Sequence, residues 1–212
     1  MIKMLKRVKK VEMVNQTKIP SRESLPRFGG GQGVGKIIKT TKVETPLGEM
    51  IAGATDEGIC ILEFAGRKTV NTELNDLSIL LKSSFKDGEN KHLKTLRKQL
   101  KEYFAGKRKE FTVPLVTPGT EFQQTVWREL LNIPFGSTRS YLEQATAIGK
   151  CGSVRAVANA NGINRISVII PCHRVIGSDG RLTGYGGGLE RKKWLLDHEK
   201  KYSGKAVEMS LF

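Results

Sequence analysis

From residue 43 onward, the pattern of apolar and polar positions predicts a small α+β unit. The stretch EMIAGATDEGICILEF contains two short apolar runs, and branched residues such as Ile59 and Ile61 pack well on a half-buried pleated surface. Between the runs, residues 56–58 (Asp-Glu-Gly) favour a tight turn. We therefore expect two strands that form a hairpin.

Two segments with helical spacing follow the hairpin. The first is NTELNDLSILLKSSF and the second is NKHLKTLRKQLKEYFAG. The second segment places four apolar residues on one face: Leu93, Leu96, Leu100 and Phe104. Gly106 then stands where the helix is expected to stop.

The chain changes character at FTVPLVTPGT, whose two prolines and glycine predict a connector with a domain boundary near Thr117. Thr120 and Gln123 have the spacing of a capping box, which marks the start of a helix. Apolar residues recur at every fourth position after it: Phe122, Val126 and Leu130. Because Pro134 ends this helix, the second half is predicted to be a separate, mainly helical unit.

Two further short helices predict a helix-turn-helix. Ser140 and Glu143 repeat the capping-box spacing, and this helix runs to Gly149. The residues KCGS then turn the chain, and Ser153 is expected to cap a third helix that begins with SVRAVANAN. Two helices joined in this way are typical of DNA-binding proteins, although any helical hairpin shares the shape.

The third helix carries small residues at Ala156, Ala158 and Ala160, which would let its backbone approach a partner surface closely. Arg155, near its start, offers a planar charged group. The alternative is that the alanines only allow tight helix packing and that Arg155 pairs with a carboxylate.

The net charge is more informative than the overall composition. The 212 residues are 38% hydrophobic and 27% charged, as in ordinary globular proteins, but the formal net charge is +15. Such an excess favours a phosphate-rich partner, although a merely solvated basic surface has the same composition. The excess is concentrated in residues 1–42, where eleven Lys or Arg stand against two Glu.

Residues 1–42, which include GGGQGVG, are therefore interpreted as a basic, flexible leader, and residues 203–212 as a tail. The leader lacks the apolar core of about 7 to 15 residues that a secretory signal needs. No apolar run is long enough to span a membrane, so that no membrane association is expected.

Three cysteines, Cys60, Cys151 and Cys172, are an odd number for a disulfide framework and favour the cytoplasm. With only three histidines and no CxxC motif, a structural zinc site is not expected, and no metal is assigned. We interpret Cys60 and Cys151 as structural residues.

The candidate reactive residues lie around Cys172. The apolar run ISVII is interpreted as a strand buried on both faces, ended by Pro171, which places Cys172 at a strand-to-loop junction. A buried free cysteine is usually a small apolar residue. Here, however, His173 adjoins it, a glycine-rich loop follows, and the next helix places Leu195 and Glu199 on one face.

These residues form a candidate nucleophilic triad. A thiol with a pKa of about 8.5 is mostly protonated near neutral pH, so that it needs a base. His173 can take the proton of Cys172, and Glu199 can orient the imidazole. Because adjacent side chains diverge, a water is expected between thiol and imidazole.

The segment PCHRV, together with FQQTVW, IPFGSTRSY, VRAVANANG and GYGGGLERKKWLLDHE, resembles the methylated-DNA-protein-cysteine methyltransferases, which repair O6-alkylguanine. The match covers about residues 44–201. The preceding region also resembles the one before the repair domain in the bacterial adaptive-response regulator, although the transcription-factor module and zinc domain are missing. The resemblance implies an α+β fold: a small ribonuclease-H-like domain (43–117), then a helix-turn-helix and active-site domain (118–202).

The resemblance also implies catalytic roles. Cys172 corresponds to the alkyl acceptor, His173 to a base acting through a water, and Glu199 to the group that orients it. Asn164 corresponds to the residue that ties the helix-turn-helix to the active-site segment. Tyr141 corresponds to the tyrosine that rotates a phosphate and donates a hydrogen bond to guanine.

For DNA, the resemblance implies that the third helix enters the minor groove and that Arg155 fills the space left by a flipped nucleotide. The implied DNA-binding residues are Ser153, Arg155, Ala156, Ala160 and Tyr141. The implied walls of the guanine pocket are Val175 through its carbonyl, Tyr185 and Gly186. The turn residues Cys151 and Gly152, and Arg165 after Asn164, depart from prolines that are common in the family.

The function implied is single-turnover transfer of an alkyl group from O6-alkylguanine in double-stranded DNA to Cys172, by a monomer that needs no cofactor. The thioether product is a poor leaving group, so that each molecule acts once. Two alternatives remain: a lesion-binding or transcription-regulating protein without catalysis, and a cysteine hydrolase, which would need an oxyanion hole and turnover.

Overall fold

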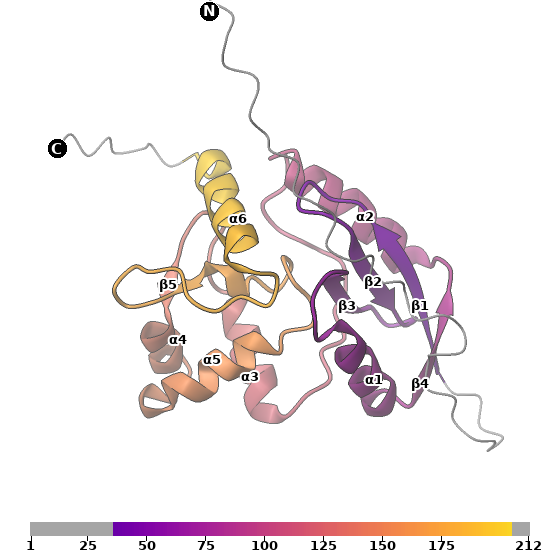
Figure 1. Cartoon of the computed structure of the whole chain (residues 1–212), viewed down its shortest axis with the longest axis horizontal. Coiled ribbons are helices and arrows are strands. Elements are labelled where there is room, and N and C mark those ends of the chain that lie inside the picture. The colour runs from indigo at the N-terminus through magenta and orange to yellow at the C-terminus, as the bar shows by residue number, and fades with distance from the viewer. Residues whose placement is uncertain (1–35, 205–212) are drawn as a thin grey trace, which may run out of the picture.

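The computed structural model describes residues 36–204. Its first half is a four-stranded sheet with two helices, drawn on the right of Figure 1. The strands are β1 (Lys36–Val43), β2 (Met50–Ala54), β3 (Ile59–Phe64) and β4 (Ser83–Asp87), and the helices are α1 (Val70–Leu80) and α2 (Lys91–Phe104). The order in the sheet is β3-β2-β1-β4, and the antiparallel pairing of β2 with β3 confirms the hairpin.

Two expectations for this half need correction. Strand β1 begins at Lys36, so that the part of the leader from residue 36 to 42 belongs to the sheet, where it pairs with both β2 and β4. The helical interpretation of NTELNDLSILLKSSF extends too far, because α1 ends at Leu80 and Ser83 already starts β4. Residues 1–35 of the predicted leader lie outside the described residues.

Helix α2 has the predicted apolar face. Leu93, Leu96 and Leu100 are buried in the core, and Phe104 packs against it. The helix ends before Gly106, whose φ of +72° is one that glycine adopts without strain. Asn90, which was not anticipated, accepts hydrogen bonds from two backbone N–H groups and caps the start of the helix.

The second half is mainly helical. Its elements are α3 (Glu121–Leu130), β5 (Arg139–Ser140), α4 (Tyr141–Ala147), η1 (Cys151–Ser153), α5 (Val154–Gly162), η2 (Cys172–Arg174), β6 (Val175–Ile176) and α6 (Leu189–Tyr202). Both predicted capping boxes are present, at the start of α3 and of α4. Helices α4 and α5, with η1 between them, form the helix-turn-helix. Ser153 makes no side-chain capping bond, because it lies inside the 3-10 turn rather than before it.

The run ISVII is buried as expected, but it is not a strand. Residues 167–169 form turns, and Val168 has a φ of +73°, which interrupts extended backbone. Only Ile166 forms a bridge, with Leu62 of β3. Cys172 therefore starts the 3-10 helix η2 instead of standing at a strand end.

One continuous core joins the two halves. It runs from Ile59 and Leu62 in the sheet, through Tyr103 in α2, to Trp127 in α3 and Leu195 in α6. The segment around Cys172 belongs to this shared core, through Ile166, Val168, Ile169, Ile170 and Cys172 itself. None of the helices between residues 36 and 204 is long and apolar enough to cross a lipid bilayer.

Candidate active site

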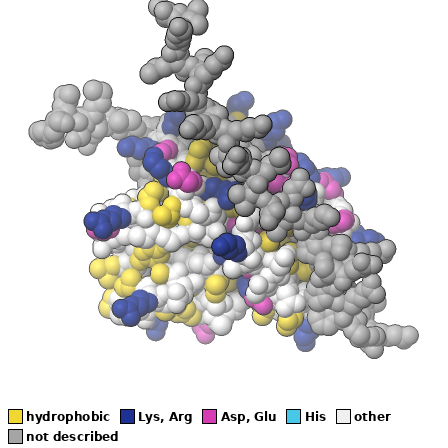
Figure 2. All heavy atoms as spheres, in the orientation of Figure 1, with side chains coloured by type: hydrophobic (Ala, Val, Ile, Leu, Met, Phe, Trp, Pro, Cys, Tyr) yellow, Lys and Arg dark blue, Asp and Glu magenta, His cyan; other side chains and the backbone are white. Residues whose placement is uncertain are grey.

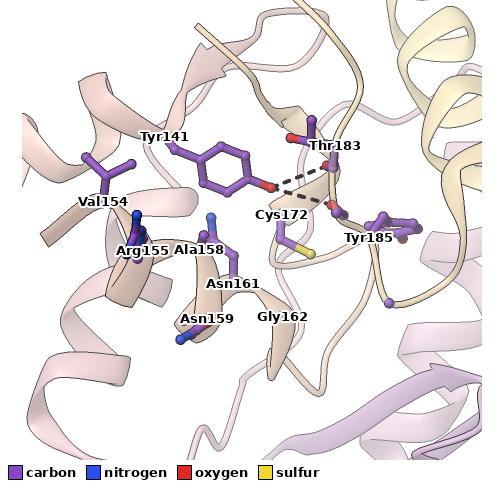
Figure 3. Close-up of a pocket in the computed structure, with 12 residues that line it drawn as sticks. Tyr141, Val154, Arg155, Ala158, Asn159, Asn161, Gly162, Cys172, Thr183 and Tyr185 are labelled. Carbon is purple, nitrogen blue, oxygen red and sulfur yellow. Dashed lines mark hydrogen bonds between the residues drawn. The ribbon is translucent and has the colours of Figure 1, made fainter.

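Cys172 lies at the inner wall of a pocket of about 490 Å³ (Figure 3). The pocket is formed by α5, the start of α4 and the glycine-rich loop, which comprises residues 177–188. Its lining residues are Tyr141, Val154, Arg155, Ala158, Asn159, Asn161, Gly162, Cys172, Thr183, Gly184, Tyr185 and Gly186. The Tyr141 hydroxyl points across the pocket to the carbonyl oxygens of Thr183 and Gly184, at 3.4 Å from each.

The resting form of Cys172 is a thiol. Burial raises the pKa of Cys172 to about 11, and the hydrogen bond from the Asn164 side chain opposes only part of that effect. The thiolate is the nucleophilic form, so that a base must remove the proton for Cys172 to react.

His173 and Glu199 form a fully buried pair, with His173 Nε2 at 2.8 Å from Glu199 Oε1. Because an ionised carboxylate only accepts, Nε2 carries the proton and Nδ1 holds the lone pair. Burial lowers the pKa of His173, although Glu199 opposes the effect. Nδ1 is buried without a hydrogen-bond partner within the described residues. His173 is thus arranged as a neutral base.

Glu199 receives four further hydrogen bonds. Arg174 donates from Nε at 2.8 Å and from Nη2 at 3.0 Å, the Gly136 N–H donates at 3.0 Å, and the Tyr103 hydroxyl donates at 2.8 Å. Burial would raise the pKa of Glu199, but His173 and Arg174 outweigh it and hold the pKa well below its usual range. Arg174, Gly136 and Tyr103 were not predicted from the sequence, since no spacing rule connects them to residue 199.

Lys192 is a further residue near the site that was not predicted from the sequence. It is fully buried, and its Nζ donates to the carbonyl oxygens of Val175 at 2.5 Å, Thr183 at 2.6 Å and Gly184 at 3.2 Å. Burial lowers its pKa to about 8. Lys192, Leu195 and Glu199 share the buried face of α6, and this helical spacing could have revealed the lysine.

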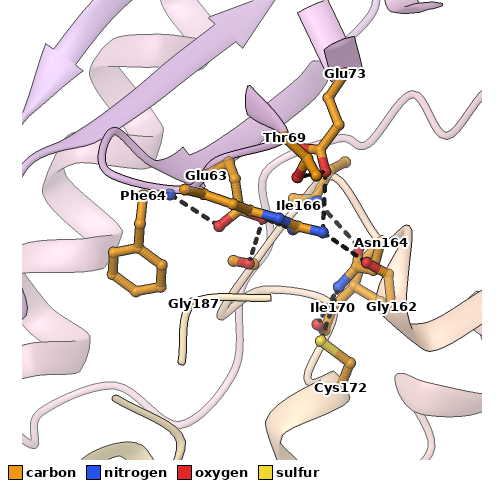
Figure 4. Close-up of polar contacts among 12 residues, drawn as sticks. Glu63, Phe64, Thr69, Glu73, Gly162, Asn164, Ile166, Ile170, Cys172 and Gly187 are labelled. Carbon is orange, nitrogen blue, oxygen red and sulfur yellow. Dashed lines mark hydrogen bonds and ion pairs between the residues drawn. The ribbon is translucent and has the colours of Figure 1, made fainter. Parts of the chain in front are cut away.

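Asn164 connects the end of α5 to the segment that carries Cys172 (Figure 4). Its Nδ2 donates to the Ile170 carbonyl at 2.9 Å and contacts Cys172 Sγ at 3.4 Å. Its Oδ1 accepts from the Ile166 N–H at 3.0 Å. The amide therefore sets both the turn and the position of the thiol.

A buried ionic cluster joins the sheet domain to this region (Figure 4). Arg67 binds Glu63 at 2.5 Å and Glu73 at 3.0 Å, and its Nη2 donates to the carbonyl of Gly162 at the end of α5 at 2.6 Å. Ser167, in the turn before Cys172, donates to Glu63 at 2.9 Å. The first domain thus contacts both the helix-turn-helix and the catalytic segment.

The predicted DNA-facing residues differ in exposure. Arg155 and Ala156 are exposed and Ser153 is partly exposed, whereas Ala160 is buried in the core, and its carbonyl accepts a bond from Trp127. The side chain of Ala160 therefore does not reach the surface. Figure 2 shows Lys and Arg side chains spread over the face of the molecule that is turned toward the viewer. Apolar side chains gather toward the lower left of this view, where Figure 1 places α4 and α5.

Of the predicted pocket walls, Tyr185 and Gly186 line the cavity, while Val175 is buried and its carbonyl accepts a hydrogen bond from Lys192. Between residues 36 and 204, no group of three or more His, Cys, Asp or Glu side chains is arranged to hold a metal ion.

Two family models match the chain. The ribonuclease-like domain of 6-O-methylguanine DNA methyltransferase matches residues 38–117, and the DNA binding domain of the same family matches residues 121–201. These matches confirm the α+β fold that the motifs implied.

Individual proteins similar to this chain belong to the same family as the two models. A methylated-DNA-protein-cysteine methyltransferase of Mycobacterium bovis is 56% identical over 114 residues, which are 54% of this chain and 68% of the relative. The constitutive enzyme of Bacillus subtilis is 42% identical over 164 residues, or 76% of this chain and 94% of the relative. The crystal structure of the Mycobacterium tuberculosis OGT protein in complex with DNA has a TM-score of 0.66 at 40% identity, and covers 78% of this chain and 94% of that one. The chain therefore belongs to the 6-O-methylguanine DNA methyltransferase family of DNA repair enzymes.

Proposed function

We propose that Cys172 accepts the alkyl group of an O6-alkylguanine that has been flipped out of duplex DNA into the pocket. The observation that carries the proposal is a buried thiol on the wall of a cavity of about 490 Å³, next to a histidine whose free nitrogen is held ready by Glu199. Catalysis and substrate binding would use residues of one chain, which supports action as a monomer. The three free thiols support a cytoplasmic location.

The transfer begins with the proton of the Cys172 thiol, which passes through a water to His173 Nδ1. Glu199 stabilises the imidazolium that forms, because its carboxylate faces Nε2. The thiolate then attacks the alkyl carbon in line, so that the S–C bond forms as the bond from carbon to guanine O6 breaks. The electron pair stays on guanine, where the Tyr141 hydroxyl stabilises the developing negative charge by donating a hydrogen bond. Guanine then takes up a proton from water. Cys172 is a poor leaving group from the thioether that forms, so that the protein acts once.

DNA would be held by α5 in the minor groove. Flipping a nucleotide costs a few kcal/mol, which an inserted side chain and backbone contacts offset. Arg155 is exposed on the rim of the pocket and would fill the vacated space, with Ser153 and Ala156 against the groove. Tyr185 and Gly186 would form the walls around the base.

The test is to incubate the protein with duplex DNA that bears one O6-methylguanine and to measure intact and peptide masses. We expect a gain of one methyl group on Cys172, at no more than one equivalent, and none in Cys172→Ser. Cys60→Ser and Cys151→Ser serve as matched controls and should react normally. Binding without any mass gain would instead identify a lesion sensor, and release of free methyl product with turnover would identify a hydrolase.

A further inference from the structure

Tyr103 is the residue of the first domain that reaches the catalytic carboxylate. It lies in the last turn of α2 and is fully buried, with its ring packed against Phe111, Phe135 and His198. Its hydroxyl donates to Glu199 Oε1 at 2.8 Å. Burial, together with the nearby Glu199, holds the pKa of Tyr103 well above its usual value, so that the group stays a donor.

The oxygen that Tyr103 binds is also the one that His173 binds. Nε2 of His173 lies 2.8 Å from Oε1, and Arg174 Nη2 approaches the same atom at 3.0 Å. A carboxylate oxygen that accepts several hydrogen bonds is less basic than one that accepts few. Tyr103 therefore influences how strongly Glu199 attracts the proton of the imidazole.

We propose that Tyr103 is a positioning residue for alkyl transfer, through which the first domain holds Glu199 and keeps His173 neutral, with Nδ1 free to accept the proton of Cys172. This inference rests on the proposed function. It also gives the first domain a part in the chemistry, since every other donor to Glu199 in the described structure comes from the second half: Gly136, His173 and Arg174.

The sign of the effect follows from the groups around His173. Glu199 favours the protonated imidazole, whereas Arg174 and Lys192 oppose it, and the Tyr185 ring packs edge-on at 6.4 Å. Loss of the Tyr103 hydroxyl makes Glu199 a stronger acceptor for the imidazole proton, while Arg174 and Lys192 stay unchanged. His173 should then be protonated at higher pH, where it can no longer act as a base.

The experiment compares Tyr103→Phe with wild type in single-turnover methyl transfer from pH 5 to 9. We expect the rate at neutral pH to fall about tenfold, as for loss of a hydrogen bond to a charged group. The acidic limb of the pH-rate profile should also move to higher pH. NMR titration of the His173 ring, which needs no DNA, should show its pKa rising in the variant.

Tyr202→Phe is the matched control, because Tyr202 also packs on His198 and is not among the groups that bind Glu199 in the described residues. It should leave the profile unchanged. Replacement of Tyr103 by 3-fluorotyrosine keeps the shape but makes the hydroxyl a stronger donor, so that the limb should move to lower pH. If Tyr103→Phe does not fold, the 3-fluorotyrosine protein alone tests whether the Tyr103 hydroxyl controls the protonation of His173.

A lower rate with an unchanged acidic limb and an unchanged His173 titration would overturn the proposal and leave Tyr103 as a packing residue. If the wild-type protein transfers no methyl group at all, the proposed function fails, while the NMR titration still decides whether Tyr103 controls His173.

Discussion

At the scale of single residues, the site combines buried groups that would each be costly alone. A buried thiol, a buried imidazole, a buried carboxylate and a buried ammonium lie within one segment and one helix face. Specific partners make this burial tolerable: Asn164 for Cys172, Glu199 for His173 Nε2, and three carbonyls for Lys192. His173 Nδ1 is the exception, because it is buried without a partner in the described residues. Such a concentration of shifted pKa values is typical of functional sites.

Lys192 predicts a pH dependence of stability. Burial lowers its pKa from 10.5 to about 8, so that the unfolded chain binds more protons than the folded protein between these values. Folding is therefore penalised below pH 8, and the penalty fades as the pH rises to 10.5. In urea titrations over this window, the free energy of unfolding of wild type should rise relative to that of Lys192→Met. Parallel curves for the two proteins would contradict this.

At the scale of elements, the glycine-rich loop is shaped by the first domain. A Cβ placed on Gly187 would lie 2.7 Å from the ring of Phe64, which is fully buried at the end of β3, and 2.8 Å from the ring of Tyr185. The Arg191 guanidinium also stacks on the Phe64 ring, at 4.4 Å from the ring centre. The wall of the pocket is therefore aligned by the end of a strand from the other domain.

We expect Gly187→Ala to displace the loop and slow methyl transfer by about 10- to 100-fold, because small misplacements of binding groups have effects of that size. Gly66→Ala, at an exposed position two residues after Phe64, is the control, since nothing lies within 4 Å of its added Cβ. Single-turnover rates with circular dichroism as a check on folding measure both. Equal rates in the two variants would show that the loop adapts to the extra methyl group.

At the scale of the whole molecule, the domains are joined by charge as well as by the core. Arg67 lies between Glu63 and Glu73 and also binds the last turn of α5. Burial raises the pKa values of Glu63 and Glu73, and Arg67 is the strongest of the groups that oppose this effect. The sheet domain is thereby linked to the helix-turn-helix.

Arg67→Met should destabilise the protein by about 3–5 kcal/mol, the usual effect of leaving a buried charge without its partner. The double variant with Glu63→Gln removes one of the two carboxylates that lose their partner and should recover part of the loss. Urea denaturation at pH 7 measures both changes. If the double variant is no more stable than Arg67→Met, the loss comes from packing instead of charge.

Much of this organisation could be predicted from local pattern. The capping boxes at Thr120 and Ser140, the apolar face of α2 and the helix-turn-helix all depend on neighbours within four residues, and all are present. The motifs around Cys172 identified the family. The structure brings His173 and Glu199 together, as predicted, although 26 residues separate them.

Other features were decided by partners distant in sequence. Strand β1 forms inside the predicted leader because β2 and β4 flank it, and ISVII turns because Val168 and its neighbours pack between the domains. Ala160 faces the core because Trp127 of α3 covers it.

Residue types at short, regular spacings are enough to identify the family, the order of the helices and Cys172 as the candidate nucleophile. The placement of Tyr103, Arg174 and Lys192 around the candidate site follows from the tertiary structure alone. Their hydrogen bonds span up to 96 residues of chain, and no local periodicity records which buried donor meets which buried acceptor once the two domains share one core.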